Sequence, residues 1–320
     1  MSHSLVVVIP DLRAEHSARL REAAARFGFE CHICSSSAQS RRFLPEAEVI
    51  LSADHSLAGQ APNLKWMCSH FAGVDPFLKE GVFASPEAIL SNSSGAYGVT
   101  ISEHIVMLLL DILRRNPEYQ RNIQQRAWIR SLPIRSIYRS RILMLGTGDI
   151  GQEACRRLRA FEPSFIKGVN FHGNNPGNLF DQVKTPEKLD SLLADTDLLI
   201  ISLPGTKATF HMISTPQLRL LPAHAVIINV GRGTVVDQAA LEEELQNERL
   251  YAGLDVFENE PLAAESVLWD SPRAVITPHV AGGTSLQHTV DRIVNLFLED
   301  FENYCTGRPL LRQIDRSIGY

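Results

Sequence analysis

Residues 141–159 constrain the fold of this chain more than any other segment. An apolar run at 141–145, typical of a buried strand, leads directly into the sequence GTGDIG at 146–151 and then into a helix-compatible stretch. In such a turn the first glycine permits the bend, the second admits a pyrophosphate and the third lets the helix pack on the sheet. Free N–H groups at the helix start would face the phosphates. The segment predicts a dinucleotide-binding βα unit.

Further apolar runs alternate with helix patterns after this unit. The expected strands in this part of the chain are residues 141–145, 165–169, 198–203, 225–230, 252–254 and 274–277. Strands that alternate with helices favour a doubly wound parallel sheet. We therefore expect an α/β protein with a Rossmann dinucleotide-binding domain at residues 99–287.

The N-terminal third has the same alternation on a smaller scale. Apolar runs at 5–9, 49–51 and 64–68 suit parallel strands, and an amphipathic helix begins near residue 288. We expect a smaller, flavodoxin-like α/β substrate domain at residues 1–98, completed by residues 288–320.

One stretch between the two expected domains is almost wholly apolar. Residues 101–113 predict a long buried helix, either between domains or at a subunit contact, which Pro117 ends or kinks. Residues 119–140 have little periodicity and are expected to form a surface connection.

Composition argues against several classes of protein. The 31 basic and 36 acidic residues are interspersed, which disfavours a nucleic-acid partner. The apolar run near the start is too short for a signal sequence or membrane span, so we expect a cytoplasmic protein without a membrane partner. Among five cysteines the only close pair is Cys31 and Cys34, with no second pair to complete a zinc site. We expect reduced structural thiols and no metal.

Four more motifs directly follow predicted strands. They are LPGT at 203–206, NVGRG at 229–233, DVFENEP at 255–261 and PHVAG at 278–282. Open α/β sheets bind their ligands at this edge, where the strands end. The motifs therefore predict one ligand site built from several loops.

Taken in order with GTGDIG, these motifs make the chain resemble the D-isomer-specific 2-hydroxyacid dehydrogenase family, of the glyoxylate/hydroxypyruvate reductase-like kind, over residues 92–284. HFAGVD at 70–75, NSSG at 92–95 and SEH at 102–104 match more loosely. The resemblance implies an oxidoreductase that uses NAD(P)H to reduce a small 2-oxo acid, such as glyoxylate, hydroxypyruvate or pyruvate, to the D-2-hydroxy acid, and the reverse. It also implies a homodimer.

Three side chains in these motifs have the chemistry that such a reduction needs. The guanidinium of Arg232 can bind a carboxylate through two N–H groups and still polarise the carbonyl oxygen. His279 can protonate the new alkoxide, because imidazole is the side-chain acid that titrates near neutral pH. Glu260 would bond to the other ring nitrogen and favour the protonated form. We therefore expect Arg232, Glu260 and His279 to be catalytic, with Arg232 and His279 also binding substrate.

The resemblance implies further site residues. Backbone N–H groups of Ala72 and Gly73 would bind the substrate carboxylate, and Asp255 would contact the nicotinamide carboxamide. The full set expected at the cofactor is Gly146, Thr147, Gly148, Asp149, Ile150, Gly151, Asn170, Leu203, Pro204, Thr209, Val230, Gly231, Asp255, His279 and Gly282.

The end of the second strand departs from the usual NAD pattern. Most NAD-specific sites have an acidic residue there, whereas this chain has Asn170, and no carboxylate follows before Asp181. An amide does not repel the 2′-phosphate of NADPH. We expect NADP or dual use rather than NAD alone.

Two alternative functions remain open. A dinucleotide-sensing corepressor on the same fold would carry recruitment tails or basic arms, and this chain shows neither. A formate dehydrogenase would ordinarily have Gln in place of Glu260. His70 and His104 are expected to be structural, while Trp128 and Trp269 are expected to be packing residues, although either could border the substrate pocket.

Overall fold

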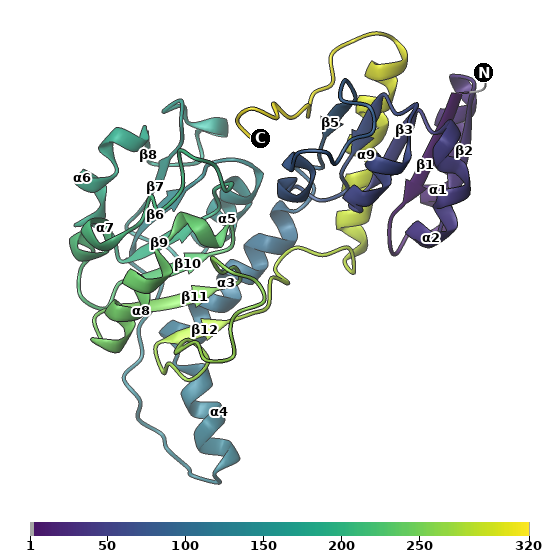
Figure 1. Ribbon diagram of the computed structural model, residues 1–320. Helices are drawn as coiled ribbons and strands as arrows, with labels where there is room; N and C mark the ends of the chain where they lie inside the picture. The colour runs from purple at the N-terminus through teal and green to yellow at the C-terminus, as the bar shows by residue number, and fades with distance from the viewer. Residues whose placement is uncertain (1–2, 320) are drawn as a thin grey trace. The chain divides into compact units, whose positions relative to one another are not determined.

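In the computed structural model, which describes residues 3–319, the chain divides into two compact units (Figure 1). One unit is the continuous segment 98–282. The other joins residues up to 97 to residues from 283 onward.

The 98–282 unit is built on one parallel sheet. Its order is β12-β11-β10-β9-β6-β7-β8. The strands are β6 (Arg141–Leu145), β7 (Phe165–Val169), β8 (Gln182–Lys184), β9 (Leu198–Ile201), β10 (Val226–Asn229), β11 (Tyr251–Leu254) and β12 (Ala274–Ile276). The strand order reverses beside β6, which lies between β9 and β7. Such a switch point is where open α/β sheets bind ligands.

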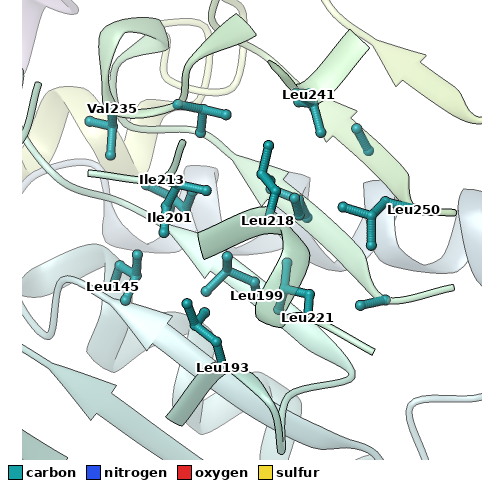
Figure 2. Close-up of a cluster of buried hydrophobic side chains, with 14 of the residues drawn as sticks. Leu145, Leu193, Leu199, Ile201, Ile213, Leu218, Leu221, Val235, Leu241 and Leu250 are labelled. Carbon is teal, nitrogen blue, oxygen red and sulfur yellow. The ribbon is translucent and has the colours of Figure 1, made fainter. Parts of the chain in front are cut away.

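Helices cover both faces of this sheet because its strands are apolar on both sides. One face bears α3 (Gly98–Leu113) and α5 (Asp149–Arg159); the other bears α6 (Asp190–Leu193), α7 (Thr215–Leu220) and α8 (Gln238–Gln246). Figure 2 shows Leu199 and Ile201 of β9 beside Leu218 of α7 and Leu221, which follows it, in a fully buried cluster. The predicted doubly wound Rossmann-type sheet is confirmed.

The other unit is a smaller parallel sheet with the order β2-β1-β3-β4-β5, which is the flavodoxin-like order. Its strands are β1 (His3–Val8), β2 (Phe29–Ile33), β3 (Val49–Ser52), β4 (Trp66–Cys68) and β5 (Ile89–Ser91). One face is covered by α1 (Ala14–Arg26) and α9 (Gln287–Cys305), the predicted C-terminal helix. The fully buried ring of Trp66 stacks on Phe297 of α9, with ring centroids 5.2 Å apart.

The sequence expectations missed three strands and two helices, one of them the four-residue α2 (Ser37–Ser40). The strands β5 and β8 have three residues each, and β2 and β8 contain polar residues at positions that are not buried. The first residues of the segment 119–140, which was expected to be a surface connection, belong to α4 (Asn116–Gln124). Pro117 lies in the first turn of α4, where its missing N–H interrupts no helical hydrogen bond.

The apolar helix between the expected domains is α3. Its buried side chains pack on α5, β10, β11 and β12 within the 98–282 unit. A β-carbon on Gly253 of β11 would lie 3.2 Å from Leu108 Cβ, so the helix lies directly on this strand. Among residues 3–319, no helix is long and apolar enough to cross a membrane.

Candidate active site

The GTGDIG turn joins β6 to α5 as the sequence predicts. Gly146 has a left-handed φ of 98°, and a β-carbon on Gly151 would lie 2.2 Å from the Gly146 carbonyl oxygen. Both positions therefore require glycine. Gly148 is different, because a β-carbon there would meet no heavy atom within 4 Å.

This turn fits a dinucleotide. The open space beside Gly148 is what the pyrophosphate needs, and α5 begins at the next residue without a side-chain cap. Its first N–H groups and the positive end of its dipole are available to an anion. The carboxylate of Asp149 is turned away to the start of α3, where it accepts the Gly98 N–H at 2.7 Å.

Asn170 directly follows β7 and lies beside the glycine turn. Its amide donates to Thr147 Oγ1 at 2.5 Å and to the Asn174 carbonyl at 2.8 Å. Its Oδ1 accepts the His172 N–H at 3.0 Å. Lys167, the nearest cation in the strand, is directed elsewhere, with Nζ 3.9 Å from Asp195 and over the ring of Phe165. The second strand thus ends in a neutral amide that is fixed to the turn.

The loop after β9 contains Leu203, Pro204 and Thr209. Thr209 is buried, and its hydroxyl donates to the Pro204 carbonyl at 2.6 Å while accepting the Thr206 N–H at 2.8 Å. The side chain therefore closes the loop on itself, which leaves backbone groups of the loop to contact a cofactor.

Arg232 lies in a tight turn after β10 that only glycine neighbours allow. A β-carbon on Gly231 would lie 2.5 Å from the Leu203 oxygen, and one on Gly233 would lie 1.9 Å from the Phe257 carbonyl carbon. The buried side chain of Asn229 fixes the turn by accepting the Gly231 N–H and donating to the Arg232 carbonyl. The glycines of NVGRG thus hold the arginine between two neighbouring loops.

Glu260 and His279 form a hydrogen-bonded pair. His279 Nδ1 lies 2.7 Å from Glu260 Oε2, and Glu260 Oε1 accepts the Phe257 N–H at 3.0 Å. Because the carboxylate occupies Nδ1, the Nε2 side of the imidazole is the one that can face a substrate. His279 has a left-handed φ of 54°, an unfavourable conformation for a residue with a side chain.

Asp255 holds the histidine loop in that conformation. Its fully buried carboxylate accepts the N–H groups of Val280 and Ala281 at 2.9 and 3.0 Å, and its carbonyl accepts the His279 N–H. Both carboxylate oxygens are thus engaged by the protein. Gly282 ends this loop and this unit.

Ala72 and Gly73 lie in the other unit, in the loop after β4. The Ala72 carbonyl accepts the Asn92 amide at 2.6 Å, and Tyr97 donates its hydroxyl to the His70 carbonyl at 2.6 Å. Within residues 3–319 the N–H groups of Ala72 and Gly73 have no hydrogen-bond acceptor. The loop is fixed by its neighbours while two donors remain available.

His70 in this loop is not suited to acid–base chemistry. Burial lowers the pKa of His70 to about 4, and its Nδ1 is buried without a hydrogen-bond partner among the described residues. The ring is therefore neutral at physiological pH, in line with the expected structural role.

A pocket of about 550 Å³ in the 98–282 unit adjoins the Glu260–His279 pair. Its lining is mostly apolar and includes Phe257, Leu262 and Trp269. Trp269 is half exposed and lines this pocket, which is the alternative that the sequence analysis left open for it. Trp128 is 86% exposed, so the expectation that it is a packing residue is wrong. The buried tryptophan of the chain is Trp66.

Comparison with known proteins identifies the family. The model of the D-isomer specific 2-hydroxyacid dehydrogenase NAD binding domain matches residues 106–281. The chain belongs to this family. It is an NAD(P)-dependent 2-hydroxyacid dehydrogenase, as the sequence motifs predicted.

Individual members are similar over almost the whole chain. The glyoxylate/hydroxypyruvate reductase B of Serratia proteamaculans is 29% identical and aligns over 96% of this chain and 99% of its own length. A family member from Aeromonas salmonicida superposes with a TM-score of 0.85 at 29% identity, over 99% of this chain and 100% of its own. An NADPH-dependent glyoxylate/hydroxypyruvate reductase from Sinorhizobium meliloti, solved with NADP and sulfate, gives a TM-score of 0.80 at 28% identity, with the same coverage.

Sequence reasoning did not foresee one contact beneath the dehydrogenase motifs. His211 Nε2 lies 2.6 Å from Glu258 Oε1, which also accepts the Gln238 N–H. This contact anchors the 257–260 segment to the loop after β9 and to α8. The two residues lie 47 positions apart, and His211 is outside the motifs, so no local pattern could have paired them.

Proposed function

We propose that this dehydrogenase reduces a small 2-oxo acid of the glyoxylate or hydroxypyruvate kind to the D-2-hydroxy acid, and catalyses the reverse reaction. The observation that supports it best is the 2.7 Å contact between His279 Nδ1 and Glu260, a carboxylate-oriented imidazole whose other nitrogen can serve a substrate. The names of the relatives from Serratia proteamaculans and Sinorhizobium meliloti favour the same substrates.

The reduced nicotinamide, when bound, supplies a hydride to the carbonyl carbon. His279, protonated on both nitrogens, gives its Nε2 proton to the carbonyl oxygen as the hydroxyl forms, while Glu260 stabilises the imidazolium until that transfer. Arg232 binds the substrate carboxylate and polarises the carbonyl. In the reverse direction neutral His279 takes the hydroxyl proton.

For the cofactor we propose the residues expected from the motifs, with NADPH used at least as well as NADH. Gly146 to Gly151 hold the pyrophosphate, and Asn170 stands where an acid would reject the 2′-phosphate. The Sinorhizobium meliloti relative is described as NADPH-dependent.

We further propose a homodimer, as the family resemblance implies. The helix first considered for this contact, α3, packs most of its apolar side chains within its own unit, although Met107 is exposed. Exposed apolar side chains are instead found in α4 and in the segment that joins it to β6, namely Ile123, Trp128, Ile129 and Ile134. A stretch of this kind is typical of a subunit interface. Light scattering after gel filtration would give the mass, and Trp128→Ser should shift it toward 35.6 kDa.

The decisive experiment follows the absorbance of NADPH and NADH with glyoxylate, hydroxypyruvate, pyruvate and phenylpyruvate, and assigns product configuration by chiral chromatography. We expect oxidation of NADPH with glyoxylate and with hydroxypyruvate. The product of hydroxypyruvate, which has a stereocentre, should have the D configuration. Arg232→Ala should lower kcat/KM by on the order of 10²–10³-fold. Binding of the nucleotide without turnover of any oxo acid would favour the corepressor alternative.

A further inference from the structure

Beneath the histidine loop, three side chains from distant parts of the 98–282 unit form one hydrogen-bonded chain. His104, in the middle of α3, places Nε2 2.9 Å from Thr277 Oγ1. Thr277 Oγ1 in turn lies 2.6 Å from Asp255 Oδ1. His104 Nε2 is also 3.7 Å from that carboxylate oxygen. A helix, the residue after β12 and the residue after β11 are thus joined.

The direction of each bond follows from the chemistry of the groups. The Asp255 carboxylate can only accept, so the Thr277 hydroxyl donates its one proton to Asp255. Thr277 Oγ1 must then accept from His104, which fixes the His104 proton on Nε2. Burial lowers the pKa of His104, against the field of Asp255, which raises it. His104 is therefore neutral at physiological pH and still a donor at Nε2.

Asp255, the last residue of this hydrogen-bonded series, determines where His279 lies. Asp255 accepts the Val280 and Ala281 N–H groups, and the His279 N–H is shared by the carbonyls of Asp255 and Thr277. These contacts hold His279 at its left-handed φ of 54°. Any shift of Thr277 or of the Asp255 carboxylate would move the imidazole, and displacements on the order of 1 Å cost up to about 10²-fold in rate.

We propose that His104 is a positioning residue for His279, acting through the Thr277 hydroxyl and the buried Asp255 carboxylate. The role rests on the proposed function, because positioning matters only if His279 transfers the proton. It requires a donor at the Nε2 position and not a positive charge. His104 acts through Thr277 and Asp255, and its contribution is to the geometry of the 277–281 segment.

Two variants at His104 separate the donor from the bulk of the ring. The amide nitrogen of Gln stands as many bonds from Cα as histidine Nε2, so His104→Gln can restore the bond to Thr277, whereas His104→Leu fills the space without a donor. Glu103→Gln is the matched control on the same helix, because the Glu103 side chain is 65% exposed and contacts Arg157 instead.

The first measurement is hydrogen–deuterium exchange of the 277–282 segment, which does not depend on activity. We expect faster exchange in His104→Leu and wild-type exchange in His104→Gln and Glu103→Gln. In the steady state, kcat of His104→Leu should fall about 10- to 100-fold, while KM for NADPH changes less than about threefold. His104→Gln should keep the pH profile of the wild type.

Two results would overturn the proposal. One is wild-type exchange and wild-type kcat in His104→Leu. The other is an equally faster exchange and an equally lower kcat in His104→Gln and His104→Leu. If His104→Leu does not fold, the same test can be made at Thr277, the next residue of the hydrogen-bonded series. Thr277→Val removes the hydroxyl and Thr277→Ser keeps it. If the wild type reduces no oxo acid, the proposed function fails and the positioning role fails with it. The exchange data would then still report whether His104 orders the segment.

Discussion

Gly233 packs against the backbone of Phe257 so closely that a β-carbon on the glycine would lie 1.9 Å from the Phe257 carbonyl carbon. The turn that contains Arg232 and the segment that contains Glu260 therefore rest directly on each other. The Phe257 N–H, in the preceding peptide group, donates to Glu260, so displacement of Phe257 moves the carboxylate as well.

We expect Gly233→Ala to damage both stability and catalysis. The added methyl group must push the 257–258 peptide away, and overpacking of this kind costs about 1–3 kcal/mol. Thermal unfolding should shift downward, and kcat for the oxo acid should fall about 100-fold because Glu260 loses its position. An unchanged melting temperature would contradict the close contact.

Gly148→Ala should behave in the opposite way. No heavy atom lies within 4 Å of the added β-carbon, and the φ of −73° suits alanine. The free energy of unfolding should change by less than about 0.5 kcal/mol. The methyl group fills the space proposed for the pyrophosphate, so the Kd for NADPH, measured by fluorescence titration, should rise more than about tenfold. Wild-type affinity would place the phosphates elsewhere.

Glu260→Gln tests the coupling of the Glu260–His279 pair. A carboxylate 2.7 Å from Nδ1 stabilises the imidazolium, and an amide does not. We expect the reductive kcat/KM to fall about 10- to 100-fold in the variant, because Nδ1 loses the carboxylate that orients the ring. A wild-type kcat/KM would contradict a catalytic role of this contact.

Asn170→Asp should shift cofactor preference toward NADH. The new carboxylate repels the 2′-phosphate, and it also loses the two amide donations to Thr147 and Asn174. Asn170→Ser removes the same amide donors without adding charge. The difference between the two variants therefore gives the effect of the negative charge on cofactor preference. The measurement is the ratio of kcat/KM for NADPH and NADH. A wild-type preference for NADH above about tenfold, or about 1.4 kcal/mol, would contradict the proposed role of Asn170.

The acid stability of the 98–282 unit should depend on Arg141. Its guanidinium hydrogen-bonds to Asp197 at 2.8 and 3.0 Å and lowers the pKa of that carboxyl. A lowered folded-state pKa stabilises the fold above the ordinary value of 3.8, and this contribution disappears as the pH falls through the folded-state value. Asp197 is about one-third exposed, so we expect Arg141→Gln to cost only about 1 kcal/mol at pH 7 and less near pH 3. Urea unfolding at both pH values checks this.

The sequence was sufficient to predict the features that depend on residues close together along the chain. The glycine turn lies between β6 and α5, and Arg232, Glu260 and His279 each follow the end of a strand, because parallel strands direct their carboxyl ends to one edge. The strands β2 and β8 were missed because their polar residues break the apolar pattern, and α4 was missed because none of its side chains is fully buried, which leaves no apolar periodicity.

Contacts across long sequence separations could not be predicted. The bond between His104 and Thr277 spans 173 residues, and the hydroxyl of Thr209, expected at the cofactor, is engaged inside its own loop. Motifs locate a residue type at a strand end, but hydrogen-bond partners depend on which elements the topology brings together.

The order of the two units along the sequence has a consequence for biosynthesis. Residues 98–282 form one uninterrupted segment, so a nascent chain can fold this unit as soon as it leaves the ribosome. The sheet of the other unit begins with β1 yet lacks α9, whose Phe297 and Phe301 cover Trp66, until residues 287–305 are made. During translation that tryptophan face stays uncovered for nearly two hundred residues of synthesis. A ribosome stalled before residue 287 would hold a finished nucleotide unit beside an incomplete and chaperone-accessible sheet.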